Sequence, residues 1–227
     1  QIVWPGERDA LTAIMREVVR RNRVHDGLVY IQVSRGVARR DHVFPVSPVK
    51  PSLVVTSRAS DPQAARAKAG EGIAVITVPE NRWERVDIKS VGLLPNVLAK
   101  QKARESGAGE AWFIDHDGIV KEGAATNAWI VTKDGILVTR PADFGILRGI
   151  TRTTVMDIAR EQGLSVEERG FSVEEAKQAR EAFITAATTL VMPVVRIDDA
   201  TVANGHPGGV ALALRDAFFD TAEKTPV

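Results

Sequence analysis

The sequence predicts a fold of the α+β or mixed α/β class. Two Asp-Gly pairs, at 117–118 and 134–135, each separate two short apolar runs, which is the strongest short-range signal for a β-hairpin. Around these hairpins lie segments whose apolar residues recur at helical spacing. Strands in runs with helices between them favour this class over a strictly alternating doubly wound fold.

The first part of the chain predicts one helix and two strands. Apolar residues at 11, 14, 15, 18 and 19 form a stripe on a helix from Glu7 to Asn22. Segments 28–34 and 52–56 are rich in β-branched residues and predict strands. The polar stretch 60–72, rich in Ala and Gly, is typical of a connection between domains. We therefore expect a smaller, incomplete N-terminal α/β domain over 1–62, a linker over 63–69 and a larger cofactor-binding domain over 70–227.

The larger domain mixes strands and helices. The apolar run 72–79 predicts a strand, and 84–89 alternates apolar with charged residues, which also predicts a strand. Pro95 is suited to the first turn of a helix, and Ser172 with Glu175 forms a capping box that predicts another helix. The remaining predicted elements are a helix at 151–162, strands at 181–187 and 191–198, and a last helix at 210–221.

Composition excludes several classes of function. The 30 Lys and Arg residues balance 29 Asp and Glu residues and are scattered among them, which argues against a nucleic-acid or membrane-surface binder. No apolar run approaches the about 18 residues that a membrane span needs. The chain has no Cys, and its four His lie far apart, so we expect no metal site and a reducing, cytoplasmic location. A helix is predicted almost directly after Gln1, so we also expect residues ahead of it that this sequence lacks.

Two charged residues are candidates for chemistry. Lys89 precedes an apolar segment, where a lysine of lowered pKa could bind an aldehyde as a Schiff base and move protons. Glu122 precedes a run of small residues, so its carboxylate could approach a cationic ring nitrogen and keep it protonated. Taken alone, each residue is more typical of an ordinary solvated position on a strand.

Three further clusters could bind anions. Gly149, Ile150 and Thr151 begin a helix, whose free N–H groups and dipole favour a phosphate. The segment 185–189 has a similar small and hydroxylated character at a strand end. Arg40 and His42 follow the strand that contains Tyr30, and a guanidinium beside a titratable donor could hold a substrate carboxylate. Ordinary loop and helix-start positions remain the alternative for each.

Together, these segments resemble the fold-type IV pyridoxal-phosphate enzymes, which include branched-chain and D-amino-acid aminotransferases and aminodeoxychorismate lyase. Three separated motifs carry the resemblance in order: VDIKSVGLLPNVLAKQKA, EGAATNAWIV and LRGITR. The family pattern is matched by Glu122, Asn127, Thr139, Leu147, Gly149, Ile150 and Arg152. The resemblance covers nearly the whole chain.

The resemblance implies pyridoxal 5'-phosphate as cofactor, bound to Lys89 as a Schiff base, with Lys89 as the catalytic base. It implies that Glu122 contacts the ring nitrogen and that Leu147 packs on the ring. The other implied cofactor-binding residues are Asn127, Gly149, Ile150, Thr151, Ala187 and Thr188. It also implies a homodimer that acts on small amino and keto acids, without a nucleic acid or membrane partner.

One segment indicates the subfamily. YIQVSRGVARRDHVFP is most similar to the D-amino-acid transaminases, in which an R-x-H pair binds the substrate carboxylate. Arg40 and His42 match that pair, with Tyr30 nearby, and the resemblance allows them to serve the partner's site. We therefore expect transamination of D-alanine or D-glutamate with pyruvate or 2-oxoglutarate. The alternatives are aminodeoxychorismate lyase, a branched-chain or (R)-amine transaminase, and a non-catalytic homologue or fragment.

The chain departs from the family pattern at three positions. Trp129 replaces a usual Phe or Tyr, Ala187 replaces a phosphate-binding Thr or Ser, and Leu190 replaces a frequent Glu. At Ala187 only the backbone N–H carries over, and Thr188 could supply a hydroxyl instead. The family also has a segment ahead of the position of Gln1, including an Arg that binds the phosphate and residues that line the substrate pocket.

Overall fold

A computed structural model of the chain describes residues 2–222. These residues form two compact units that divide between Gln63 and Ala64. The last five residues of the expected larger domain, 223–227, lie outside the described residues. None of the described helices is both long and apolar enough to cross a membrane.

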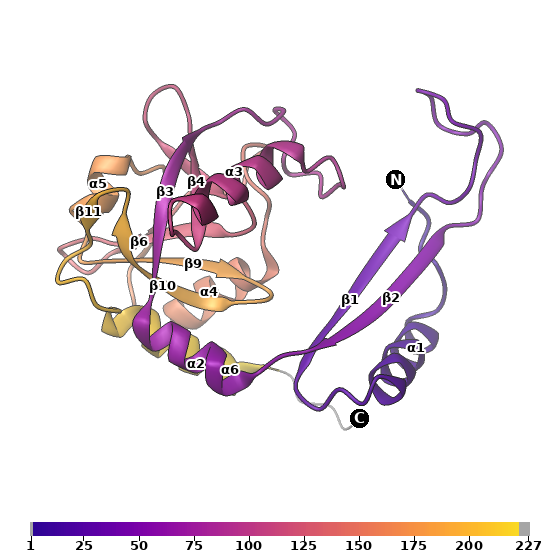
Figure 1. Ribbon diagram of the computed structural model, residues 1–227, viewed down its shortest axis with the longest axis horizontal. Coiled ribbons are helices and arrows are strands. Elements are labelled where there is room, and N and C mark those ends of the chain that lie inside the picture. Colours follow the sequence, from indigo (N-terminus) through magenta and orange to yellow (C-terminus); the bar gives the residue numbers. More distant parts are fainter. Residues whose placement is uncertain (1, 223–227) are drawn as a thin grey trace. The chain divides into compact units, whose positions relative to one another are not determined.

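The first unit is one helix on a two-stranded hairpin (Figure 1). Strand β1 (Gly27–Ser34) pairs antiparallel with β2 (Ser52–Ala59) along the full length of both strands. Helix α1 (Arg8–Arg21) packs on β2. The predicted helix and both strands are confirmed, and β2 extends three residues beyond the expected end because β1 offers pairing partners as far as Gly27.

The second unit is built on a nine-stranded mixed sheet. Helix α2 (Pro62–Glu71) leads into it, so the segment expected as a linker folds as an Ala-rich helix. The strand order is β5-β4-β3-β10-β9-β6-β7-β8, with β11 paired to β10. The strands are β3 (Ile73–Pro79), β4 (Glu110–Ile114), β5 (Val120–Gly123), β6 (Asn127–Val131), β7 (Leu137–Thr139), β8 (Val166–Glu168), β9 (Glu181–Ala186), β10 (Leu190–Ile197) and β11 (Ala200–Thr201).

Both Asp-Gly pairs form the predicted hairpins. The β4–β5 pair is antiparallel with Gly118 at φ +76°, and the β6–β7 pair is antiparallel with Gly135 at φ +85°. Such positive φ angles favour glycine, which has no Cβ to clash. Both turns therefore follow directly from the local sequence.

Four helices of this unit match predicted ones. They are α3 (Leu94–Glu105), α4 (Ile150–Glu161), α5 (Val173–Lys177) and α6 (Gly209–Thr221). Helix α3 packs on β4, while α4 packs on α6 and on β9, and α6 also packs on β10 (Figure 1). In the capping box, the Ser172 hydroxyl accepts from Glu175 N, but the Glu175 carboxylate binds Arg169 instead of reaching back to the helix start.

The sheet curls so that β5 lies beside β6, which follows it in the chain. A tight turn joins the two strands, and Gly123 N donates to Thr126 O at 2.7 Å. One apolar cluster, which includes Trp112 and Phe171, packs against the sheet, and a second, around Trp129 and Phe183, lies under α4 and α6. The first cluster includes Val120 of β5 and Ala128 and Ile130 of β6, so packed side chains support the seam between these two strands.

The strand predicted at 84–89 is wrong. This segment forms a turn in which Ile88 N donates to Arg85 O, and Arg85 binds Asp87 at 2.8 Å. Only two apolar residues alternate here, and a local ion pair competes with pairing to a neighbouring strand. Short alternation without a partner strand was therefore an insufficient signal.

Candidate active site

The site is centred on the buried carboxylate of Glu122, near the end of β5. Glu122 is 5% exposed. Its Oε1 accepts from Arg82 Nη1 at 2.7 Å, and its Oε2 accepts from Asn127 Nδ2 at 3.0 Å and Leu147 N at 3.1 Å. Burial raises the pKa of Glu122 to about 7, against the lowering effects of Arg82 and the Leu147 N–H. Protonation of this carboxyl is thus balanced near neutral pH.

Arg82 and Glu80 are site residues that the sequence did not single out. They follow β3, and Glu80 N is held by Ile114 O at 2.8 Å. Arg82 Nη2 donates to Glu80 Oε2 at 2.6 Å, and the guanidinium carbon lies 4.3 Å from the ring centroid of Phe113. Burial disfavours the charged form, but the two carboxylates more than compensate and raise the pKa of Arg82. In the sequence, the only signal for these two site residues was their charge and their position just after an apolar strand.

Asn127 ties three parts of the site together. It begins β6, is 4% exposed, and donates from Nδ2 to Leu147 O at 2.9 Å as well as to Glu122. Its Oδ1 faces Gly149 so closely that a Cβ at Gly149 would lie 2.2 Å from it. A glycine is therefore required here for the segment ahead of α4 to approach Glu122.

The start of α4 supplies free N–H groups beside this cluster. Gly149 is the N-cap and has no side chain to satisfy the first turn, while Thr153 N is the first to bond back to it. Ile150 is 73% exposed and Thr151 is buried. Arg152 is structural, because it donates to Glu168 Oε1 at 2.6 Å and to Arg140 O at 2.8 Å and thereby fastens the helix.

The hairpin loop between β9 and β10 lies at the same end of the sheet. Thr185 pairs with Asn127 across β9 and β6, so Ala187 and Thr188 come just beyond the Asn127 end of β6. Both are exposed. Arg215 of α6 anchors the loop, with Nη1 donating to Thr189 O at 2.6 Å and Val191 O at 2.7 Å.

Two departures from the family pattern have local consequences. Leu190 adopts φ +55°, a left-handed conformation that is uncommon outside glycine, and it directly follows the loop. Trp129 is fully buried, stacks on Phe183 with ring centroids 5.5 Å apart and donates from Nε1 to Thr185 Oγ1 at 3.0 Å. The larger ring at 129 is therefore accommodated by packing and by one added hydrogen bond.

Lys89 lies on the exposed segment between β3 and α3. The same segment begins with Arg82, which binds Glu122, so the chain that carries Lys89 is anchored to the cluster at one end. At its other end, Asn96 of α3 donates from Nδ2 to Ala124 O at 2.8 Å, in the turn after Glu122. Both ends of the lysine segment are thus attached beside Glu122.

The three predicted substrate-binding residues belong to the first unit. Tyr30 is 53% exposed on β1 and donates from Oη to Gln32 Oε1 at 3.1 Å. Arg40 and His42 are exposed in the irregular segment that joins β1 to β2. Their roles stay predictions.

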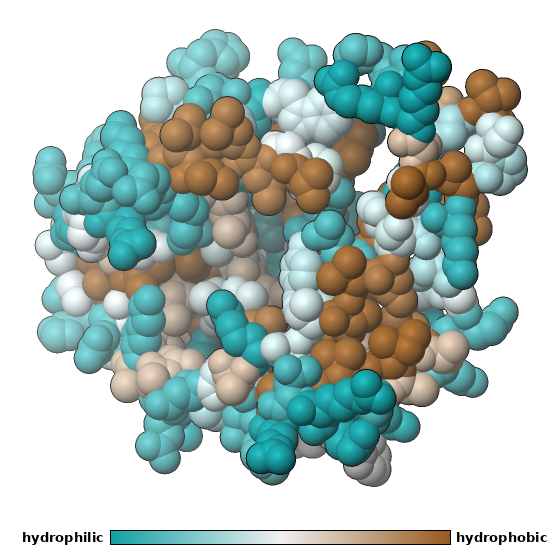
Figure 2. Space-filling model, turned by 45° about the vertical axis from the view of Figure 1, so that its right-hand side comes forward, coloured by the Kyte–Doolittle hydropathy of each residue, from teal (hydrophilic) through white to brown (hydrophobic). Residues whose placement is uncertain are grey.

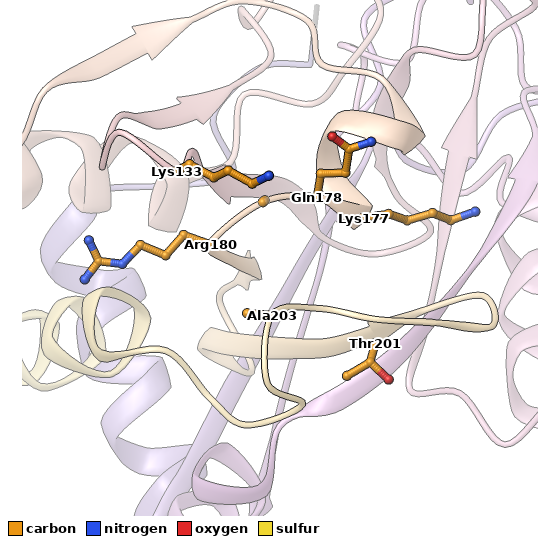
Figure 3. Close-up of a pocket in the computed structure, with 7 residues that line it drawn as sticks. Lys133, Lys177, Gln178, Arg180, Thr201 and Ala203 are labelled. Carbon is orange, nitrogen blue, oxygen red and sulfur yellow. The ribbon is translucent and has the colours of Figure 1, made fainter.

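A separate hollow of about 410 Å³ opens elsewhere on the second unit (Figure 3). Lys133, Lys177 and Arg180 line it, but Figure 3 shows the Arg180 guanidinium pointing away from the ammonium groups of both lysines. Lys177 also lies 3.5 Å from Asp198. The hollow therefore lacks the convergent cations of an anion site.

The chain matches known proteins along most of its length. Residues 1–197 match the family described as amino-transferase class IV. D-alanine aminotransferase from Staphylococcus epidermidis is 38% identical over 211 residues, covering 92% of this chain and 73% of that protein. D-alanine aminotransferase from Bacillus licheniformis is 38% identical over 219 residues, covering 95% and 76%.

Solved structures also match. A T.th. branched-chain amino acid aminotransferase with pyridoxamine 5'-phosphate has a TM-score of 0.83 and 28% identity, covering 95% of this chain and 72% of that chain. The Escherichia coli branched-chain enzyme has a TM-score of 0.80 at 24% identity, covering 97% and 72%. The predicted fold-type IV architecture is confirmed by these matches.

The site fits a group with a cationic ring nitrogen and an anionic phosphate. Arg82, Glu80 and Glu122 sum to one negative charge when all are ionised, and the side chain of Glu122 is only 7% exposed. A buried negative charge without a partner is costly, so a cation is favoured beside it. Nearby, the buried hydroxyls of Thr126 and Thr189 have no hydrogen-bond partner among the described residues. Both ends of pyridoxal phosphate would thus meet complementary groups.

Proposed function

The chain belongs to the class IV aminotransferases, and from this premise we propose that it moves an amino group between D-amino acids and 2-keto acids. The proposed donors are D-alanine and D-glutamate, and the proposed acceptors are pyruvate and 2-oxoglutarate. Relatives named D-alanine aminotransferase at 38% identity support this specificity. The observation that carries the chemistry is the buried Glu122 carboxylate with its net negative cluster.

Pyridoxal phosphate is the cofactor of this family. When bound, it supplies an aldehyde carbon that a lysine can hold covalently and a ring that accepts the electron pair of a broken Cα–H bond. We assign Glu122 to keep the ring nitrogen protonated, with Asn127 fixing the carboxylate. We assign Leu147 to pack on the ring. Its backbone N–H donates to Glu122 Oε2, which holds the residue beside the carboxylate that would contact the ring nitrogen.

The phosphate is assigned to the free N–H groups at the start of α4 and to the β9–β10 loop. Helix N-termini bind phosphate through unpaired N–H groups and the helix dipole. The assigned residues are Gly149, Ile150, Thr151, Ala187 and Thr188. Binding at this remote end holds the reacting carbon in register.

Lys89 is assigned to hold the cofactor aldehyde and, once released by the substrate amine, to accept the Cα proton. Its exposed segment lets the amine reach the substrate while both segment ends stay fixed beside Glu122. Tyr30, Arg40 and His42 are assigned to the substrate carboxylate, because a guanidinium and an imidazole together bind a carboxylate in one orientation.

We also propose that the protein works as a homodimer. Apolar side chains gather in patches on the surface (Figure 2). One patch covers the lysine segment and the start of α3 and consists of Ile88, Val91, Leu93, Leu94, Val97 and Leu98, which are 45–79% exposed. Exposed apolar side chains gathered in this way are typical of a protein interface, and a second copy would bury them.

The substrate assignment is tested with three amino donors. The cofactor-loaded protein is mixed separately with D-alanine, L-leucine and an (R)-arylamine, and the visible absorption of the cofactor is followed. We expect rapid spectral change with D-alanine. Reaction with L-leucine alone would overturn D-specificity in favour of the branched-chain activity named for the structural neighbours. Release of 4-aminobenzoate from aminodeoxychorismate would indicate the lyase.

The lysine assignment is tested by borohydride reduction of the loaded protein and peptide mapping. The cofactor adduct is expected on Lys89 in the wild type and in a Lys102→Ala control, and to be absent after Lys89→Ala. An adduct on another lysine of the wild type would refute the assignment. A protein that stays colourless with pyridoxal phosphate would support a non-catalytic homologue instead.

A further inference from the structure

Arg82 joins the buried carboxylate of Glu122 to the half-buried carboxylate of Glu80 with one planar group. Its Nε and Nη2 form a fork on Glu80, at 2.9 Å to Oε1 and 2.6 Å to Oε2, and its Nη1 reaches Glu122 Oε1 at 2.7 Å. The side chains of Arg82, Glu80 and Glu122 are 6%, 17% and 7% exposed. Fork geometry of this kind fixes both partners in direction as well as distance.

The contacts leave one acceptor position open. A carboxylate oxygen has two lone pairs. Within the described part of the chain, Glu122 Oε2 accepts two hydrogen bonds, from Asn127 and Leu147, whereas Oε1 accepts one, from Arg82. Both oxygens of Glu80 are engaged by Arg82, and Oε1 also accepts from Arg82 N at 2.9 Å. The open position is therefore on Oε1 of Glu122.

The charges favour a cation at that position. One guanidinium faces two carboxylates, so the group retains a net negative charge when all three are ionised. In a buried site such a charge is relieved either by a proton on Glu122 or by a cationic ligand. Glu80 increases the excess negative charge, while Arg82 reduces it.

We propose that Arg82 and Glu80 are positioning residues that act on Glu122 in opposite senses. Arg82 presents Oε1 of Glu122 as the acceptor for a protonated ring nitrogen and keeps Glu122 ionised. Glu80 holds Arg82 in place and, by its own charge, makes the cluster receptive to a cation. This inference rests on the proposed function of Glu122 and extends it to residues outside the ring contact.

The test measures the proton affinity of Glu122 in the cofactor-free protein. Glutamate labelled with ¹³C at the carboxyl carbon is titrated by NMR, and the Glu122 signal is assigned from its loss in Glu122→Gln. Arg82→Gln is expected to raise the proton affinity at least about tenfold, because an opposite charge in contact is removed. Glu80→Gln is expected to lower it, because a like charge is removed while the amide oxygen still accepts from Arg82.

Matched variants separate this role from general damage. Arg169 likewise bridges two carboxylates, Glu167 and Glu175, on the surface, so Arg169→Gln should leave the Glu122 titration unchanged. Arg82→Lys keeps the charge without the fork and should give an intermediate shift, which protects the test if Arg82→Gln fails to fold. Shifts of the same sign in the Arg82→Gln and Glu80→Gln variants, or no shift in either, would overturn the proposal.

A second readout follows the loaded protein. The ¹⁵N signal of ring-labelled pyridoxal phosphate reports whether the ring nitrogen carries a proton. Arg82→Gln should move this signal toward the unprotonated position, and Glu80→Gln should weaken cofactor binding. If the wild type bound no cofactor, the proposed function would fail, but the titration of the unloaded protein would still decide whether Arg82 and Glu80 act on Glu122 in opposite senses.

Discussion

At the scale of single residues, burial of Glu122 makes the folded protein sensitive to pH. The pKa of Glu122 is about 7 in the folded protein, and an unfolded glutamate titrates near its ordinary value of about 4.3. Between these values the folded state retains a proton that the unfolded chain releases. The retained proton therefore stabilises the folded protein. This stabilisation is fully present below the pKa of Glu122 in the unfolded chain, and roughly 3 kcal/mol of it is lost as pH rises to about 7.

Glu122→Gln should remove that dependence. Without cofactor, the free energy of unfolding of the wild type should fall relative to that of Glu122→Gln as pH rises from about 4 to about 8. Urea unfolding at a series of pH values measures it. The exposed Glu84, substituted as Glu84→Gln, is the control, for which the difference should stay constant. A constant difference for Glu122→Gln as well would contradict the buried-acid interpretation.

Gly149 is constrained by close contact with Asn127. A Cβ would lie 2.2 Å from Asn127 Oδ1, so Gly149→Ala must displace the amide that holds Glu122. We expect a loss of about 1–3 kcal/mol in stability and weaker cofactor binding, measured by urea unfolding and by fluorescence titration. Gly70→Ala in α2 has open space around the added methyl and should be neutral or slightly stabilising. Equal effects of the two substitutions would refute the argument.

At the scale of elements, a carboxylate from a strand caps the last helix. Glu181 of β9 is buried and accepts from Val210 N at 3.0 Å and Ala211 N at 2.9 Å. Negative charge at a helix N-terminus satisfies free N–H groups and the dipole. Since α6 also carries Arg215, which anchors the β9–β10 loop, the cap links a helix start to the proposed phosphate site.

Glu181→Ala should therefore have two effects. We expect about 2 kcal/mol of lost stability and weaker cofactor binding through loosening of the loop. Denaturant unfolding and cofactor titration measure them. The control is Glu174→Ala. The Glu174 side chain is 75% exposed, with Oε1 3.6 Å from Lys177 Nζ, so its loss should change neither stability nor cofactor affinity appreciably. A destabilised Glu181→Ala protein with unchanged cofactor affinity would show that α6 does not control the loop.

The elements that the sequence predicted correctly are those with local signals. Gly118 and Gly135 specify their hairpins through backbone conformation, and Ser172 caps α5 through a contact three residues away. The strand predicted at 84–89 failed because a strand needs a partner, which local alternation does not reveal. Arg82 was missed for the same reason, since its contact with Glu122 joins residues 40 positions apart.

At the scale of the whole molecule, the second unit already gathers most of the proposed cofactor site. Strand β5 is the first strand in the sheet order, and β6 lies nearer the other end of that order. The two strands are nevertheless in contact, because the sheet curls. Glu122 and Asn127 meet at that seam because a tight turn joins β5 to β6, and Asn127 Nδ2 also donates to Leu147 O, ahead of α4. Pairing of the neighbouring strands β3, β4 and β5 brings Glu80 and Arg82, which follow β3, to Glu122 and so assembles the charge cluster.

The exposed apolar patch on the same unit predicts the assembly. Wild-type protein is expected to sediment as a dimer, because the patch formed by Ile88 and its apolar neighbours through Leu98 needs a partner surface. Leu94→Glu combined with Val97→Glu places two charges in that surface and should yield monomers at the same concentration. Lys133→Glu, at an exposed turn outside the patch, changes the net charge equally and should leave the dimer intact. If both proteins sedimented like the wild type, the dimer interface would have to lie elsewhere. If the wild type itself were a monomer, the proposed assembly would fail.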